Sequence, residues 1–271
     1  MIWTGRRAAP LHDWAMTPRE AIALQRRLAG RVSQTPPRRP LRTVAGLDVS
    51  VRRDETTCRA GAVLMTVEPL AVVARARVER PVPFPYVPGL LSFRELPVLL
   101  EALARLPELP DALVLDGHGR AHPRRFGLAC HLGVWADLPA LGAAKSILCG
   151  THGPLGRERG ATAPLVHRGE TVGVALRTRD DVQPIYVSVG HRLDLPAAVA
   201  LALRLAPRYR LLEPIRQAHR LVNENDARGG GNEVVRGGAD RPAIRPARGE
   251  RVPEERGRKE GDGKEGGGVR G

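Results

Sequence analysis

Apolar runs separated by turn residues predict a mixed β-sheet covered by helices, which is an α/β fold. Apolar runs of strand length occupy residues 43–51, 60–67, 70–78, 112–115, 144–148, 171–176 and 185–189. Helical spacing of apolar residues occupies residues 17–28, 90–106, 123–132, 196–205 and 213–222. Short turns join the first three strands, which is typical of an antiparallel meander, and helices alternate with the later strands. We therefore expect one mixed sheet flanked by helices.

The last part of the chain differs in composition from the rest. Counted from Asn223, 49 residues contain 13 glycines, 11 Lys and Arg, 10 Asp and Glu, and no aromatic residue. Such a segment cannot bury enough apolar surface to offset the entropy that is lost on ordering. We expect one folded domain, residues 1–224, followed by a disordered Gly/Arg/Glu-rich tail, residues 225–271.

The positive charge lies in the folded part. The formal net charge is +14 at pH 7, and residues 1–222 carry +13 of it. A basic body attracts polyanions because it neutralises phosphates and releases counterions. Nucleic acid is the first partner that this charge predicts and an anionic membrane surface the second. The alternative is an Arg-rich composition from biased codon usage.

The cysteines and the N-terminus indicate the compartment. Cys58, Cys130 and Cys149 form no C-x-x-C pair, so neither a disulfide framework nor a structural zinc site is indicated. Arg6 and Arg7 precede no apolar signal segment, and no apolar run approaches about 18 residues. These features predict a soluble cytoplasmic protein without a membrane partner.

The stretch from Asp111 to Gly133 carries the densest candidate chemistry. The apolar run 112–115 ends on Asp116, which Gly117 and Gly119 follow within three positions. Glycines permit a sharp turn and a close approach of a ligand to main-chain N–H groups. Histidines and arginines crowd the same strand end, which favours a metal or phosphate site there. The alternative is a strand, a turn and a solvated basic helix start.

Three carboxylates occupy positions where a charge is costly unless it is compensated. Asp48 lies inside an apolar strand, Glu95 near the start of a helix, and Asp116 at a strand end. Oxygen-rich sites favour Mg²⁺ or Mn²⁺, which activate water in phosphodiester cleavage. The alternatives are a hydrogen-bonded or arginine-paired Asp48 and a Glu95 that simply favours the first helical turn.

Three further residues are candidates. Lys145 is the one lysine of residues 1–258, which suggests that a compact ammonium is needed there, unless a rare codon survived by chance. Tyr86 stands in a proline-stiffened loop, where it would either wedge into a base stack or pack the loop. His191 closes an apolar strand and is a candidate general acid or base, metal ligand or structural histidine. His118 and His122 have the spacing of a zinc pair, but Gly119 and Pro123 argue against one helix there.

Five segments in this order resemble the endonuclease V family of inosine-directed nucleases over residues 11–224. They are Val44-Ala-Gly-Leu-Asp-Val-Ser50, Pro85-Tyr-Val-Pro-Gly-Leu-Leu-Ser-Phe-Arg-Glu95, Asp116-Gly-His-Gly-Arg-Ala-His-Pro-Arg-Arg125, Ala144-Lys-Ser146 and Tyr186-Val-Ser-Val-Gly-His191. The resemblance implies a ribonuclease H-like fold and a Mg²⁺-dependent DNA-repair endonuclease. Such an enzyme cuts DNA at the second phosphodiester bond 3′ of deoxyinosine, leaving 3′-hydroxyl and 5′-phosphate ends.

The resemblance also implies roles for individual residues. Asp48 and Asp116 would bind the metal, Glu95 would complete the acidic cluster, and Lys145 and His191 would assist catalysis. Tyr86 resembles the family's strand-separating wedge. The residues expected at the DNA, close to an extruded hypoxanthine base, are Tyr86, Pro88, Gly89, Leu91, Gly117 and His122. The tail is not part of the family pattern.

We therefore expect a monomeric, Mg²⁺-dependent deoxyribonuclease that acts on deoxyinosine in DNA, with Mn²⁺ as a possible substitute. One alternative keeps the fold and changes the substrate to inosine-containing RNA or to a hybrid. Single-stranded DNA or RNA is a further possible partner. Another is a non-catalytic nucleic-acid-binding protein whose acidic residues are structural. The sequence discriminates DNA from RNA poorly, because recognition of a 2′-hydroxyl depends on geometry.

Overall fold

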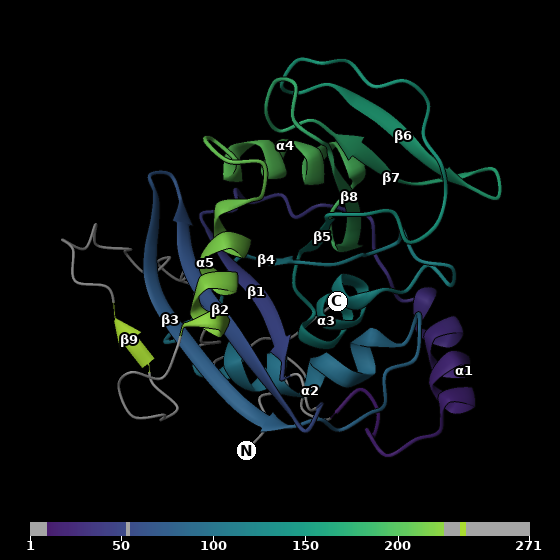
Figure 1. The fold of residues 1–271 in the computed structure, drawn as a ribbon, viewed down its shortest axis with the longest axis vertical. Coiled ribbons are helices and arrows are strands. Elements are labelled where there is room, and N and C mark those ends of the chain that lie inside the picture. The colour runs from purple at the N-terminus through teal and green to yellow at the C-terminus, as the bar shows by residue number, and fades with distance from the viewer. Residues whose placement is uncertain (1–9, 53–54, 225–233, 237–271) are drawn as a thin grey trace, which may run out of the picture. The chain divides into compact units, whose positions relative to one another are not determined.

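A single mixed sheet organises the protein (Figure 1). The computed structural model describes residues 10–52, 55–224 and 234–236. Within these residues the strand order is β6-β7-β8-β5-β4-β1-β2-β3-β9. The strands are β1 (Thr43–Val51), β2 (Thr57–Val67), β3 (Leu70–Pro81), β4 (Ala112–Leu115), β5 (Ala140–Ala144), β6 (Thr162–His167), β7 (Glu170–Leu176), β8 (Ile185–His191) and β9 (Val234–Arg236).

The strand directions bring distant parts of the chain to one edge. Strands β1, β2 and β3 form the predicted antiparallel meander, whereas β1, β4 and β5 run parallel. Leu47 pairs with Leu115, so Asp48 and Asp116 follow paired residues of neighbouring strands. Lys145 directly follows β5. Because parallel strands end on the same side of a sheet, these three residues share one edge.

Helices cover both faces of the sheet. The helices are α1 (Pro18–Ala29), α2 (Leu91–Ala104), α3 (Leu128–Ala136), α4 (Leu195–Leu205) and α5 (Glu213–Asn223). Helices α2 and α3 pack into the core cluster that contains Ala45 and Leu47, and α4 and α5 pack into the one that contains Val44. Because side chains alternate along β1, Val44 lies on the same face of the sheet as Gly46 and Asp48. Asp48 therefore lies on the α5 side.

The start of α1 matches its sequence signature. The Thr17 side chain accepts a hydrogen bond from the Glu20 backbone, and the Glu20 carboxylate accepts one from the Thr17 backbone, with Pro18 in the first turn. This reciprocal cap satisfies N–H groups that a helix start leaves unpaired. Helix α1 then packs through Leu24 and Leu28 into a third cluster with Phe84 and Phe126.

Three local predictions were wrong. The strand expected at residues 144–148 is β5, Ala140–Ala144, whose small residues give little apolar signal, and Ile147 and Leu148 are exposed. Small residues are needed because a Cβ on Gly142 would lie 2.4 Å from the Gly117 carbonyl oxygen. The helix expected from residue 123 begins at Leu128, and strand β6 was not predicted.

Most of the predicted tail, residues 225–271, lies outside the described residues, and its residues 234–236 form β9 against β3. The expected boundary between the folded domain and the tail, after residue 224, therefore stays a prediction. Among the residues that the structure describes, no helix is long and apolar enough to cross a membrane.

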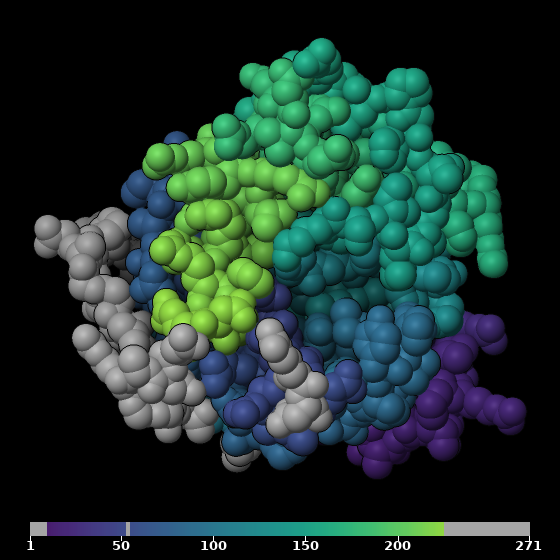
Figure 2. All heavy atoms as spheres, in the orientation of Figure 1, coloured from purple at the N-terminus to yellow at the C-terminus, as the bar shows by residue number. Residues whose placement is uncertain are grey.

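Two glycines let α5 lie directly on the strands, and Figure 2 shows the light-green α5 region next to blue atoms of the strands. A Cβ on Gly46 of β1 would lie 2.2 Å from the Pro214 carbonyl oxygen. A Cβ on Gly61 of β2 would lie 2.9 Å from a methyl group of Val222. Both ends of α5 thus lie against residues without a side chain, and this determines the distance between the helix and the sheet.

Gly46→Ala should lower the free energy of unfolding by about 2–3 kcal/mol, because backbone rather than a flexible side chain occupies the space of the new methyl group. Urea denaturation measures this change. Gly153→Ala is the matched control, since nothing lies within 4 Å of its added Cβ, and it should change stability by less than about 0.5 kcal/mol. Equal effects of the two substitutions would contradict the seating of α5 on Gly46.

Candidate active site

Three carboxylates from three elements meet at the edge where β1 and β4 end. Asp48 of β1 and Asp116 after β4 have side chains that are 11% and 14% exposed. Glu95 is in the second turn of α2 rather than the first, and it is half-buried. Burial, together with the charges of Asp48 and Asp116, raises the pKa of Glu95 to about 8. The sequence therefore identified three acids that the fold brings into electrostatic contact.

Two cationic or polar side chains partly neutralise these acids. Lys145 forms an ion pair with Asp116, and its side chain remains 43% exposed. His219 of α5 contacts Asp48, with 2.8 Å between Nδ1 and Oδ2. Burial raises the pKa of Asp48, and the hydrogen bond with His219 opposes that rise. The structure thus places Lys145 beside the acidic cluster.

Sequence reasoning missed His219. Helix α5 buries Pro214, Ala218 and Val222 at intervals of four residues, and His219 adjoins this stripe. The periodicity therefore predicts a histidine at the border between the core and solvent. It does not predict that α5 crosses β1 with His219 above Asp48, because Gly46 and Gly61 determine that crossing. The side chain is 57% exposed and accessible to a substrate.

The structure does not bring His191 to the acidic cluster. Strand β8 is antiparallel to β5, so His191 pairs with Ala140 while Tyr186 pairs with Ala144, next to Lys145. His191 thus lies roughly 13 Å along the sheet from the lysine end of β5, since a strand rises about 3.3 Å per residue. Its Nε2 lies 3.3 Å from Asp137 Oδ1, and its Nδ1 accepts a hydrogen bond from the backbone of Ser33. This arrangement is structural.

Tyr86 projects from its loop. Its side chain is 65% exposed, whereas Phe84 of the same loop is buried against α1 and α2. The loop is packed by Phe84, so Tyr86 is not needed for packing. Pro88 and Leu91 are also exposed, and the Arg94 guanidinium lies 6.0 Å from the centre of the Tyr86 ring. An exposed aromatic ring on a stiff loop thus lies near the residues that flank Glu95.

The carbonyl of Gly89 anchors this loop. It accepts hydrogen bonds from Gln25 Nε2 at 3.0 Å, His122 Nε2 at 3.0 Å and an Arg124 guanidinium nitrogen at 2.7 Å. Gly89 has φ +79°, a conformation that favours glycine. The loop that presents Tyr86 is therefore fixed to the segment after Asp116, although these segments are far apart in sequence.

His122 is buried and neutral. Its Nε2–H donates to Gly89, and its Nδ1 accepts from the backbone N–H of Arg124, so both ring nitrogens are used. Burial, together with the neighbouring Arg124 charge, lowers the pKa of His122 to about 4. His122 is thus placed as an anchor of the Tyr86 loop and is only 3% exposed.

The glycine turn after Asp116 is held by its neighbours. A Cβ on Gly119 would lie 2.1 Å from the Val189 carbonyl oxygen, so this glycine serves close packing on β8. His118 Nε2 donates to the carbonyl of Ser146 at 3.0 Å, which ties the turn to the residue after Lys145. Gly117 is half-buried at the cluster. The turn therefore fixes Asp116 relative to Lys145.

The donor set of the cluster fits a hard divalent cation. Three carboxylates offer oxygen ligands only, and their mutual repulsion favours any added positive charge. Across residues 10–52, 55–224 and 234–236, no three His, Cys, Asp or Glu side chains are arranged as a metal site. Lys145 and His219 instead contact the aspartates in this structure. Metal binding would therefore require these contacts to adjust.

Comparison with known proteins finds similarity in both sequence and structure. A family model described as Endonuclease V matches residues 26–220. The chain is 53% identical over 211 residues to Endonuclease V of Myxococcus xanthus, covering 78% of this chain and 90% of that protein. The crystal structure of Endonuclease V from Streptomyces avermitilis is 46% identical with a TM-score of 0.74, covering 77% of this chain and 92% of that one.

A more distant structure is of Ciona intestinalis Endonuclease V. It is 24% identical with a TM-score of 0.66 and covers 75% of this chain and 95% of that one. That protein is in complex with a 24mer DNA containing an inosine followed by a ribo-adenosine. Together these likenesses establish the mixed sheet with flanking helices that the sequence predicts.

The wild-type protein should lose stability faster than a His122→Gln variant as the pH falls from 6.5 to 4. Because the folded-state pKa of His122 is lowered, its contribution to folding is present above pH 6.5 and is lost as the pH falls through about 4. The expected difference over this range is about 2–3 kcal/mol in the free energy of unfolding. Denaturant titrations at several pH values measure it, and parallel pH profiles would contradict a neutral buried His122.

Proposed function

The chain belongs to the endonuclease V family, and from that premise we propose that it cleaves nucleic acid at deaminated adenine. The reaction is metal-assisted hydrolysis of the second phosphodiester bond 3′ of deoxyinosine, which leaves 3′-hydroxyl and 5′-phosphate ends. The observation that carries this proposal is the cluster of Asp48, Glu95 and Asp116 beside Lys145. One chain supplies the whole cluster, which agrees with the monomer that we propose.

The proposed cofactor is Mg²⁺, for which Mn²⁺ can substitute. Asp48 and Asp116 would hold the ion, and Glu95 would complete its surroundings. When bound, the metal activates water and stabilises the negative charge that develops on the phosphate oxygens. The family membership supports a nuclease, and the all-oxygen donor set supports a hard cation.

Lys145 and His219 act on the phosphate and on the aspartates. The Lys145 ammonium is exposed at the cluster and attracts the scissile phosphate. His219 orients Asp48 through the bond to its Oδ2, and its exposed ring lies where it can exchange a proton with water. We thus assign to His219 the assisting role that the sequence suggested for His191.

The exposed Tyr86 ring wedges into the strand as the hypoxanthine base leaves the stack. A stiff, anchored loop supports this role because the ring is presented without loss of loop entropy. Main-chain groups of Gly89 and Leu91 and of the Gly117 turn are the proposed pocket for the base, with Pro88 at its rim. His122 contributes by holding Gly89 in place. Hypoxanthine pairs weakly, so its extrusion costs less than that of a normal base.

Cleavage of matched end-labelled oligonucleotides tests the proposal. One carries a single deoxyinosine, one is RNA with inosine, and one is unmodified DNA, each with Mg²⁺ or with chelator. The wild-type protein should nick only deoxyinosine DNA, and only with Mg²⁺. Asp116→Asn should slow cleavage at least about 100-fold but leave inosine-DNA binding in place. Tyr86→Ala should reduce discrimination between inosine and unmodified DNA about tenfold, the size of one stacking contact.

The other outcomes are equally definite. A cut in the RNA alone would keep the site and reassign the substrate to inosine-containing RNA. No cut in any substrate would refute the nuclease proposal and favour a nucleic-acid-binding protein. Equal losses for inosine and normal DNA in Tyr86→Ala would remove the wedge role.

A further inference from the structure

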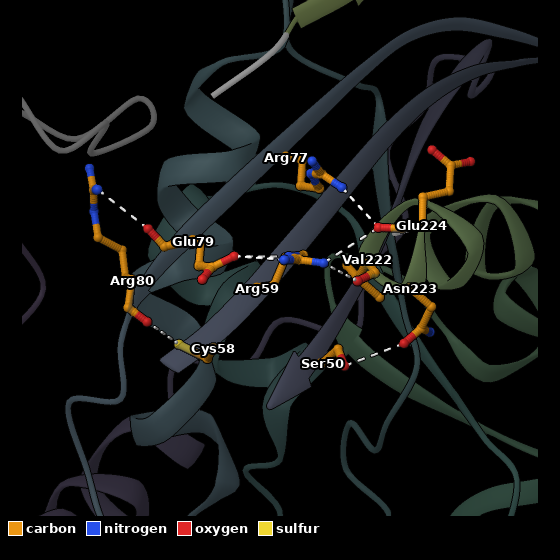
Figure 3. A network of polar contacts seen from close by, with 9 residues as sticks. All are labelled: Ser50, Cys58, Arg59, Arg77, Glu79, Arg80, Val222, Asn223 and Glu224. Atoms are coloured by element: carbon orange, nitrogen blue, oxygen red, sulfur yellow. Dashed lines mark hydrogen bonds and ion pairs between the residues drawn. The ribbon is translucent and has the colours of Figure 1, made fainter. Parts of the chain in front are cut away.

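The last turn of helix α5 is held by side chains from the sheet. The helix ends at Asn223, and the next residue, Glu224, has φ −63° and ψ 125°, which is extended backbone. The last carbonyls of a helix have no partner within the helix and need one elsewhere. At α5 arginines of two strands supply it, as Figure 3 shows.

Arg59 of β2 reaches two of these carbonyls. One terminal nitrogen of its guanidinium lies 3.4 Å from the Val222 oxygen and 3.5 Å from the Glu224 oxygen. Its other nitrogens hold Glu79 Oε2 at 3.0 and 2.8 Å, directly across from Arg59 in the β2–β3 register. Only 19% of the Arg59 side chain is exposed. Glu79 therefore fixes the guanidinium so that its remaining edge points at α5.

Arg77 of β3 completes the contact, since its guanidinium donates to the Glu224 carbonyl at 3.2 Å. Two positive charges at the C-terminal end of a helix also interact favourably with the helix dipole. From β1, the Ser50 hydroxyl lies 3.4 Å from Asn223 Oδ1, and Asn223 Nδ2 donates to the His219 carbonyl at 2.8 Å. Three strands thus hold the turn of α5 that carries His219.

We propose that Arg59 and Arg77 are positioning residues that hold His219 on Asp48. The inference rests on the proposed nuclease function for its effect on the reaction, but the positioning itself does not. The helix has a buried stripe of its own, Pro214, Ala218 and Val222, which keeps α5 on the sheet when one arginine is removed. What the arginines add is the axial position and rotation of the last turn, and hence the distance from the imidazole to Asp48.

A double-mutant cycle with kinetics tests this coupling. The proteins are wild type, Arg59→Gln, His219→Ala and the double variant, with kcat and KM measured on deoxyinosine DNA with Mg²⁺. Arg59→Gln should lower kcat about tenfold with little change in KM, because a small misplacement of a reacting group is costly. In the His219→Ala background the same change should cost less than about twofold.

Arg80→Gln is the matched control. Arg80 lies one residue beyond Glu79 on β3 and pairs with Glu101 of α2, on the opposite face of the sheet. Arg80→Gln removes the same charge as Arg59→Gln but no contact to α5, and it should change kcat less than about twofold. Arg59→Lys, which keeps the charge but loses the planar fork, should restore activity only in part. Arg77→Gln, which removes the donor to the Glu224 carbonyl, serves as the second variant if Arg59→Gln does not fold.

A readout without substrate separates this inference from the proposed function. Nitrogen-15 NMR of the His219 ring in metal-free protein should show shifted resonances in Arg59→Gln and unchanged ones in Arg80→Gln. If wild type does not cleave, the nuclease proposal fails while these shifts still support the positioning. Equal kinetic losses of Arg59→Gln in both His219 backgrounds, or unchanged His219 resonances, would overturn it.

Discussion

Mutual repulsion among Asp48, Glu95 and Asp116 is the constraint on which the rest of the site depends. Three carboxylates from β1, α2 and the end of β4 share a poorly solvated edge of the sheet, and the pKa of Glu95 rises to about 8 in consequence. Such an arrangement is costly to folding unless positive charge compensates it. Lys145, which directly follows β5, supplies part of this compensation, and His219 of α5 contacts Asp48. A divalent cation would supply the remaining positive charge. The affinity for metal therefore depends on the same repulsion among the three carboxylates.

The fold is built to maintain this arrangement. Parallel pairing of β1, β4 and β5 delivers both aspartates and the lysine to one edge. Glycines at Gly46 and Gly61 let α5 approach the strands, and Arg59 and Arg77 hold its end. A second set of contacts, centred on the Gly89 carbonyl, joins the Tyr86 loop to the segment after Asp116. Asp116 and the Tyr86 loop are thus held by one segment of the chain, residues 116–124.

The sequence predicted what depends on local pattern. Asp48, Asp116 and Lys145 stand at ends or interruptions of apolar runs, and parallel pairing explains why they meet. His219 could not be found in this way, because its place depends on how α5 crosses the sheet, and that crossing is determined by contacts at Gly46 and Gly61. His191 had the right residue type at a strand end, but β8 runs antiparallel and carries it to the far end of β5. Strand β5 was predicted at residues 144–148 instead of Ala140–Ala144, because its alanines and glycine carry little hydrophobic signal.

The most direct test of the account compares the stability of wild type and Glu95→Gln at pH 8.5, with chelator and with Mg²⁺. Because the folded-state pKa of Glu95 is raised, its ionisation costs stability as the pH rises from 4.5 to about 8, and that cost is complete at pH 8.5. With chelator, the free energy of unfolding of Glu95→Gln should therefore be about 1–3 kcal/mol higher than that of the wild type. Mg²⁺ should stabilise the wild type more than the variant and narrow or reverse this difference. Equal stability with chelator and equal responses to Mg²⁺ would contradict a strained acidic cluster that binds metal.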